Sequence, residues 1–278
     1  DLDWCGSRTV MGVGVAIAGP VDSETGTLYQ PPNLYVLDGV SLKSRWETSL
    51  GYPVLVGNDA NLAALGEFYL GAGREAAKAG TPPRTLVYLT ISTGIGGGVI
   101  ERGEMFLGAH GLAAEIGHMS IDASDSAPEC QCGARGCLES MASGTAIASI
   151  TKERIARGDF PASSLAAESD SLTSATVLQA AGRGDPLAVS ILDGVVFALS
   201  VGLTNVLHLY NPDLVVLGGG VTLGLVELDM LPRIQGMING RAMSEVHKEF
   251  RLVATHLGDD PGMVGAATLV WQNAQAGG

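Results

Sequence analysis

Short apolar runs that alternate with helical patterns are the feature that most constrains how this chain can fold. Residues 8–22 (RTVMGVGVAIAGPVD) and 52–59 (YPVLVGND) have the composition of buried strands. Residues 41–51 (SLKSRWETSLG) and 60–73 (ANLAALGEFYLGAG) have the spacing of helices, and the first of them has a Ser and a Gly where a cap and a stop belong. This alternation predicts an α/β fold with mainly parallel strands.

The second half of the chain continues in the same manner. Residues 85–111 predict a strand, a glycine-rich turn and a second strand, and helical patterns dominate from about residue 141 to residue 212. Two more strands and a closing helix are predicted at 213–221, 251–258 and 262–274.

A small, proline-rich stretch at residues 76–85 divides the chain into two predicted lobes. We expect an N-terminal α/β lobe at 1–80, joined by the C-terminal helix 262–274, and a C-terminal α/β lobe at 81–261. The C-terminal lobe would contain a polar, cysteine-rich loop at 118–137 that is held together by a ligand.

Composition and charge exclude several classes of protein. Hydrophobic residues make up 46% of the chain and charged residues 16%, which suits a packed globular protein. We find no run of about 18 apolar residues and no secretory leader, so we expect no membrane span. The net charge of −13 argues against direct contact of this chain with nucleic acid. Four cysteines at these spacings do not suggest a disulfide framework, so we expect a reducing, cytoplasmic compartment.

Three of the four cysteines, Cys130, Cys132 and Cys137, lie within eight positions. Cys130 and Cys132 are too close in sequence to pair easily, whereas thiolates gathered on a glycine-containing loop are typical of a zinc site. Reduced loop cysteines without a metal are the alternative. His118, twelve residues upstream, would complete a Cys3His set. The residues alone support His118 less strongly than the cysteines, and its inclusion rests on the resemblance described below.

A second motif, GNDAN at residues 57–61, follows a predicted strand and opens a predicted helix. Ligands bind at such strand ends in open α/β sheets. Asp59 could accept a proton from a hydroxyl as a general base, and Asn58 offers a donor and an acceptor to a polyol. The alternative is that Asp59 only caps the following helix.

Two glycine-rich loops, STGIGGG at 92–98 and LGGG at 217–220, follow apolar strands. Backbone amides in such turns can hold phosphates, although tight packing alone would also explain the glycines. Neither loop matches a Walker motif or the dinucleotide-binding fingerprint. Glu115 and Glu139 flank the predicted metal ligands, and they either accept sugar hydroxyls or are solvated charges.

Together these motifs resemble those of the ROK family of repressors, open reading frames and kinases. The following segments occur in the family's order between about residues 10 and 270: GVGVAIAGPVD, PPNL, GNDANLAALGE, TISTGIGGGVI, AAEIGHMSID, CQCGARGCLE and NPDLVVLGGGV. The combination of CxCGxxGCLE with an upstream E-x-G-H is highly specific. The resemblance implies an α/β fold of the actin-like ATPase and hexokinase type, with two ribonuclease-H-like lobes around a cleft and a zinc-bound insertion.

The resemblance also implies roles for individual residues, with Asp59 as the general base. The implied sugar-binding residues are Asn33, Asn58, Asp59, Glu115, His118 and Glu139. The implied nucleotide-binding residues are Thr93, Gly94 and Gly96 at the ATP phosphates and Gly218, Gly219 and Gly220 at the adenosine. The implied ligands of a structural Zn²⁺ are His118, Cys130, Cys132 and Cys137, and Mg²⁺ would accompany ATP.

One departure from the family pattern affects the N-terminal lobe. The family places a D-x-G-G-T strand and turn, which grips the ATP phosphates and Mg²⁺, well upstream of the Gly-Pro turn. Here only nine residues precede the strand VMGVGVAIAGP. We therefore expect this lobe to be incomplete, and the exposed edge of its sheet to be covered by a partner chain or by further residues.

Three hypotheses about function follow from the resemblance. The first is a glucokinase-like sugar kinase that phosphorylates a hexose or amino-hexose with ATP, and it is favoured by the intact GNDAN and glycine loops. The second is the sugar-sensing domain of a ROK transcriptional regulator, without kinase activity, and it is favoured by the missing phosphate element. The third is the kinase lobe of a bifunctional amino-sugar enzyme. A homodimer is expected from the family in each case.

Overall fold

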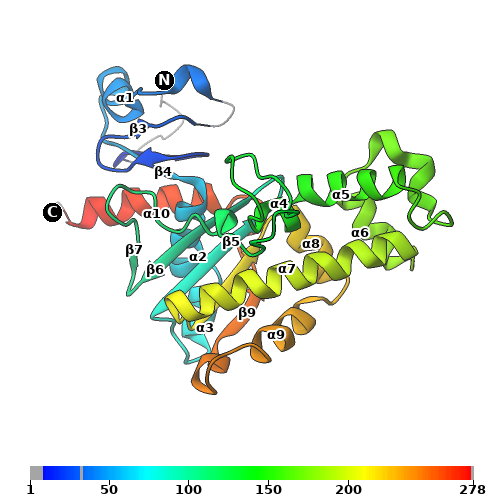
Figure 1. Ribbon diagram of the computed structural model, residues 1–278. Helices are drawn as coiled ribbons and strands as arrows, with labels where there is room; N and C mark the ends of the chain where they lie inside the picture. Colours follow the sequence, from blue (N-terminus) through cyan, green and yellow to red (C-terminus); the bar gives the residue numbers. More distant parts are fainter. Residues whose placement is uncertain (1–8, 32–33, 277–278) are drawn as a thin grey trace. The chain divides into compact units, whose positions relative to one another are not determined.

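Residues 9–31 and 34–276 are described by a computed structural model, in which the chain forms two units (Figure 1). The first unit consists of Asp1–Arg84, Gly98–Ala114 and His256–Gly278, and the second of Thr85–Gly97 and Glu115–Thr255.

The first unit contains a parallel pair of strands, β1 (Val13–Ile17) and β4 (Val54–Asn58), with Val13 opposite Val54. The helix between them, α1 (Leu42–Leu50), begins after Ser41, whose hydroxyl accepts the Ser44 N–H, and ends at Gly51 with φ of 72°. The predicted cap and stop of this helix are thus confirmed, because the local sequence supplies both.

Two helices of this unit, α2 (Asp59–Tyr69) and α10 (Pro261–Ala276), pack side by side although they lie far apart in the sequence (Figure 1). Their buried residues include Leu62, Ala63, Ala266 and Val270. Both helices also contact β1, so the C-terminal helix completes the apolar layer next to the strand pair.

The edge of β1 that does not face β4 has no partner strand within the part of the chain that the structure describes. All five residues of β1 are half-buried, whereas Val54 and Val56 of β4 are buried. The expectation that another segment or chain covers this edge stays a prediction.

The second unit is built on the strands β5 (Thr85–Ile91), β8 (Leu214–Gly218) and β9 (Arg251–Ala254), which pair in parallel in that order. Every residue of β8 is buried, because helices cover a parallel sheet on both faces, and this explains the unbroken apolar run in the sequence. A further strand, β6 (Ile95–Glu101), begins in this unit and continues into the first unit. There it pairs in antiparallel fashion with β7 (Glu104–Met105).

Helices make up most of the second unit, and the longest of them is α7 (Pro186–Tyr210; Figure 1). By length and composition α7 could cross a membrane, but 67% of its most apolar window is buried and it packs against α4, α5, α6 and α9. These contacts are those of a core helix. The other helices of the unit are α4 (Glu139–Ala142), α5 (Gly144–Ala156), α6 (Ser174–Gly182), α8 (Gly220–Glu227) and α9 (Leu231–Asn239).

Short elements complete the two units. Those of the first unit are β2 (Val21–Asp22), β3 (Thr27–Leu28), the 3-10 helix η2 (Tyr35–Leu37) and α3 (Ala72–Lys78). Those of the second unit are the 3-10 helices η3 (Ile116–His118), η4 (Ser164–Ser171) and η5 (Val246–Glu249).

The carboxylate of Glu67 is a buried polar centre of the first unit. Its Oε1 accepts the N–H groups of His256 (2.9 Å) and Leu257 (3.0 Å), and its Oε2 accepts that of Ala72 (2.7 Å). The side chain is fully buried, so these bonds join the start of α3 to the segment that leads into α10.

We expect Glu67→Gln to lower the free energy of unfolding of the first unit by about 2 kcal/mol, because the amide NH₂ would face a backbone N–H. The exposed Glu75, which forms a salt bridge with Lys78 in the same helix, gives the control Glu75→Gln, with a loss below about 0.5 kcal/mol. Urea unfolding followed by tryptophan fluorescence measures this, because Trp46 and Trp271 both lie in the first unit. Equal urea midpoints of unfolding for the two variants would contradict the stabilising role of the Glu67 carboxylate.

Candidate functional site

The cysteine-rich loop of the second unit brings together the four residues that the sequence predicts as metal ligands. Isolated bridges pair Ser120 with Cys137 and Glu129 with Arg135, and thereby fold the loop back on itself. The ligand atoms of His118, Cys130, Cys132 and Cys137 all lie within 4.8 Å of one another.

The distances within this cluster suit a tetrahedral ion. The Cys132 and Cys137 sulfurs lie 3.8 Å apart, and the Cys130 sulfur lies 3.6 Å from Nδ1 of His118. A zinc ion about 2.3 Å from each sulfur would separate two sulfurs by about 3.8 Å. The donor set of three sulfurs and one imidazole nitrogen therefore fits zinc in both chemistry and spacing.

The thiols of the cluster occupy different environments. Burial raises the pKa of Cys137 to about 12 and also raises the pKa of Cys130, whereas the Ala134 N–H lowers the pKa of Cys132. Three thiolates this close together would repel one another unless a cation lay between them, so the cluster fits a metal ion in its electrostatics as well as in its geometry.

Glu139, the first residue of α4, lies between this cluster and the glycine-rich turn that joins β5 to β6. Its Oε2 accepts the Ile95 N–H at 2.7 Å, and its Oε1 lies 4.0 Å from the Cys130 sulfur. A Cβ at Gly94 would lie 2.5 Å from Oε2, so the carboxylate can approach the turn only because this residue is glycine.

The same turn is held at its other end by the start of α5. The Gly144 N–H donates to the Ser92 carbonyl at 2.7 Å. The Thr93 carbonyl accepts two hydrogen bonds from Thr145, one from the N–H at 3.2 Å and one from Oγ1 at 2.8 Å. The helix is capped by Ser143, whose hydroxyl accepts the Ala146 N–H.

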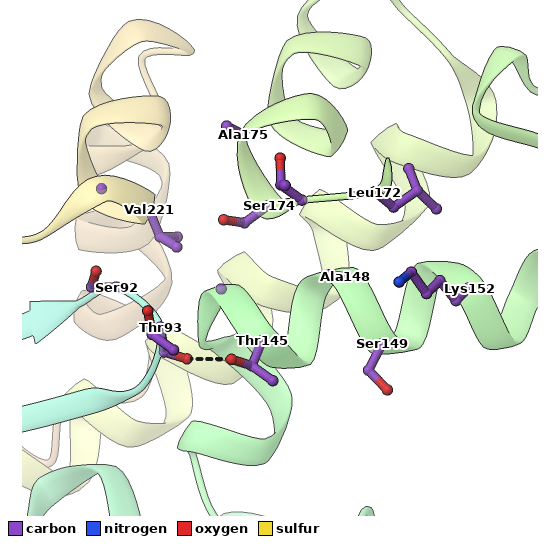
Figure 2. A pocket seen from close by; sticks show the side chains of 13 residues that line it. Ser92, Thr93, Thr145, Ala148, Ser149, Lys152, Leu172, Ser174, Ala175 and Val221 are labelled. Carbon is purple, nitrogen blue, oxygen red and sulfur yellow. Dashed lines mark hydrogen bonds between the residues drawn. The ribbon is translucent and has the colours of Figure 1, made fainter. Parts of the chain in front are cut away.

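A pocket of about 580 Å³ opens beside this turn (Figure 2). Its volume lies in the range of small-molecule sites. The thirteen residues that line it are Ser92, Thr93, Gly144, Thr145, Ala148, Ser149, Lys152, Leu172, Thr173, Ser174, Ala175, Gly220 and Val221. Lys152, on α5, is the one charged residue among them, and Figure 2 shows it farther along that helix than Thr145.

The first residues of three helices line this pocket: Gly144 of α5, Ser174 of α6 and Gly220 of α8. The amides of a helix's first turn have no partner within the helix, and the positive end of the helix dipole lies there. At α5 these amides already donate to the Ser92 and Thr93 carbonyls, whereas the starts of α6 and α8 favour an anionic ligand. The lining thus combines a lysine, hydroxyls and helix N-termini, a set that suits phosphate groups.

The structure brings two of the predicted nucleotide-binding residues, Thr93 and Gly220, to this one pocket. Gly94, Gly96, Gly218 and Gly219 are not among the lining residues. Gly219 has φ of 87°, and a Cβ there would lie 2.5 Å from the Ile91 carbonyl oxygen, so this glycine shapes the end of β8.

Sequence reasoning missed the contribution of α5 and α6 to the pocket. Thr145, Ser149 and Lys152 share one face of α5, and Ser174 begins α6. The signal for both helix starts was present in the sequence, as Ser143 before α5 and as the capping box of Thr173 and Thr176 before α6.

In the first unit, Asn58 and Asp59 lie where β4 meets α2. Asn58, rather than Asp59, is the cap of α2, because its Oδ1 accepts the Ala60 and Asn61 N–H groups. Its Nδ2 donates to the Gly19 carbonyl at 3.2 Å, which leaves one N–H of the amide for another partner.

The Asp59 side chain keeps contact with solvent, but the surrounding protein removes part of its hydration. Desolvation raises the pKa of Asp59, and the Ala60 N–H, which donates to Oδ1 at 2.8 Å, opposes the shift. A carboxylate with a raised pKa is a stronger base than an ordinary aspartate.

The other residues that the sequence predicts to bind sugar do not all belong to the same unit. Glu115 is exposed and lies directly before η3, which ends at His118. His118, Glu115 and Glu139 therefore belong to the second unit, and Asn58 and Asp59 to the first. Asn33 lies outside the residues that the structure describes.

Known proteins with similar sequences include enzymes. A glucokinase of Halalkalibacterium halodurans is 35% identical over 268 residues, which cover 95% of this chain and 77% of that protein.

Two solved structures have the same fold. The ROK family glucokinase of Streptomyces griseus, in complex with glucose and AMPPNP, is 31% identical with a TM-score of 0.77, covering 96% of this chain and 84% of that one. A ROK family transcriptional regulator, a homolog of the E. coli MLC protein, is 28% identical with a TM-score of 0.83. The match covers 98% of this chain and 65% of the regulator. These likenesses confirm the predicted actin-like ATPase fold. A sequence model of the ROK family matches residues 6–273, and the chain belongs to this family.

Proposed function

We propose that this chain is an ATP-dependent sugar kinase of the glucokinase type, which transfers a phosphoryl group to a hexose hydroxyl. The observation that carries the proposal is the pocket that contains both Thr93 and Gly220, two residues that the resemblance in sequence assigns to the nucleotide. Relatives that are glucokinases, one of them solved with glucose and AMPPNP, support the same reaction.

In this proposal the nucleotide occupies the pocket of the second unit. Its phosphates lie at the Ser92–Thr93 turn, where the starts of α6 and α8 and the hydroxyls supply donors, and its adenosine lies toward Gly218, Gly219 and Gly220. Mg²⁺ enters with ATP and neutralises phosphate charge.

The residues proposed to bind the sugar offer carboxylates, an amide and an imidazole. Asp59 accepts the proton of the attacking hydroxyl while the sugar oxygen bonds to the γ-phosphorus and ADP leaves. Asn58 contributes the amide N–H that is not engaged by Gly19, and Glu115, His118 and Glu139 hold further hydroxyls.

The Cys3His cluster would hold a structural zinc ion. A bound zinc ion would crosslink the loop through these four residues and would supply no redox chemistry. His118 would coordinate through Nδ1, which lies 3.6 Å from the Cys130 sulfur, and would leave Nε2 for a sugar hydroxyl.

A second candidate function is sugar sensing without catalysis, as in a regulator of transcription. The observation that favours it is the likeness to the ROK transcriptional regulator, whose TM-score of 0.83 exceeds the 0.77 of the glucokinase. Both functions require a sugar site, and they differ in the need for ATP.

The test is a coupled phosphorylation assay on this chain with ATP and a panel of hexoses and amino-hexoses, with sugar binding measured by calorimetry in the same samples. We expect turnover of at least one sugar. Sugar binding without turnover would refute the kinase proposal and favour the sensor.

Asp59→Asn should keep sugar binding and lower kcat by about 100-fold to 10,000-fold, because the amide cannot accept the hydroxyl proton. Asp38→Asn, a change of the same kind elsewhere in the first unit, is the control and should leave kcat unchanged. Unaltered turnover in Asp59→Asn would refute the role of this residue as the base.

The raised pKa of Asp59 gives a prediction for pH. The base form is lost as the pH falls through the pKa of the folded protein, so kcat/KM for the sugar should decline on the acid side with a pKa above the ordinary value of 3.8. A profile that stays flat down to that value would contradict the desolvated environment of the carboxylate.

Purified without chelators, the chain should contain one zinc ion, and Cys132→Ser should contain none, since three ligands hold the ion far less tightly. Cys5→Ser, which changes the one remaining cysteine of the sequence, should keep the metal. Elemental analysis measures the zinc content of each variant. A wild-type chain without metal would refute the zinc site.

Gly220→Val should weaken the binding of AMPPNP about tenfold or more, because a side chain at this position enters the pocket. A Cβ there meets no protein atom within 4 Å, so the variant should fold. Gly194→Val, at an equally open glycine in α7, is the matched control and should bind normally. Calorimetric titration measures the AMPPNP affinity of both variants. Equal affinities would mean that the nucleotide does not bind in this pocket.

A further inference from the structure

Among the residues that line the pocket, Thr145 has a position that the family motifs do not assign. We propose that Thr145 is a positioning residue, which fixes the Ser92–Thr93 turn in the orientation that binds nucleotide phosphate. The inference rests on the proposed function and names a determinant of nucleotide affinity within the same pocket.

Thr145 donates two hydrogen bonds to one carbonyl oxygen, that of Thr93. Its Oγ1 donates to the Thr93 carbonyl at 2.8 Å and its N–H donates to the same oxygen at 3.2 Å (Figure 2). The neighbouring Gly144 N–H holds the Ser92 carbonyl at 2.7 Å. Two successive carbonyls of the turn therefore point at the start of α5.

These bonds determine where the amide groups of the turn point. The C=O and N–H of one planar, trans peptide point in opposite directions. Holding the Thr93 carbonyl thus fixes the Gly94 N–H, and holding the Ser92 carbonyl fixes the Thr93 N–H. Both N–H groups are directed away from α5 and belong to the residues assigned to the ATP phosphates.

Of these contacts, only the hydroxyl bond of Thr145 can be removed by a side-chain substitution. Gly144 acts through its backbone, and the 3.2 Å bond of the Thr145 N–H persists in any variant. Without the hydroxyl the Thr93–Gly94 peptide loses its shorter bond and rotates more freely. The phosphate donors are then less ordered before binding, and affinity falls.

Thr145→Val replaces the hydroxyl by a methyl group of similar size. We expect the dissociation constant for AMPPNP to rise about tenfold, the effect of one hydrogen bond. The dissociation constant for the sugar should not change. In steady-state assays the KM for ATP should rise more than kcat falls.

A matched control is present in the same helix. Thr151 is buried, lies outside the pocket lining, and donates its hydroxyl to the Ile147 carbonyl at 2.7 Å. Thr151→Val removes the same chemical group from α5 and tests for a merely structural effect. Thr145→Ser retains the hydroxyl and should restore AMPPNP affinity to within about twofold of the wild type.

The outcomes separate the inference from the function on which it rests. Weaker AMPPNP binding in Thr145→Val, with normal binding in Thr151→Val and Thr145→Ser, supports the role of Thr145. Normal binding in Thr145→Val, or equal weakening in Thr151→Val, overturns it and leaves the kinase proposal intact. A wild-type chain that binds no AMPPNP overturns both. If Thr145→Val fails to fold, weak binding by Thr145→Ser, which keeps the hydroxyl, overturns the inference.

Discussion

The organisation of the second unit depends on hydrogen bonds between the β5–β6 turn and one continuous segment, residues 137–145. This segment begins at the metal-ligand candidate Cys137, continues with Glu139, which accepts the Ile95 N–H, and ends at Thr145, which holds the Thr93 carbonyl. Because one segment contacts both ends of the turn, the Cys3His cluster, the Glu139 carboxylate and the pocket have fixed positions relative to one another.

The positions of the charged groups match the proposed phosphoryl transfer. The pocket combines helix N-termini with Lys152 and excludes carboxylates from its lining, as an anionic ligand requires. The candidate base, Asp59, lies instead at the start of α2, where desolvation strengthens it as a proton acceptor. A chain with a net charge of −13 can therefore bind a phosphate ligand, because local donors rather than total charge decide this.

The sequence was informative where local rules act. The cap and stop of α1, the buried strand β8 and the cysteine cluster follow from capping, apolar runs and ligand spacing. Local rules could not show that Asn58 rather than Asp59 caps α2, because both residues are good caps and differ by one position. Nor could they show that Thr145 meets Thr93, which is a contact between distant segments. Such contacts depend on how helices pack on the sheet.

The most direct test of this account is hydrogen exchange at the backbone amides of Ile95, Gly144 and Thr145, measured by NMR with and without AMPPNP. All three amides donate to the contacts that join the turn to segment 137–145. The account predicts slow exchange in the free chain and still slower exchange when AMPPNP is bound. Exchange at the rate of an unfolded peptide, or no response to AMPPNP, would contradict the claim that these contacts organise a nucleotide pocket.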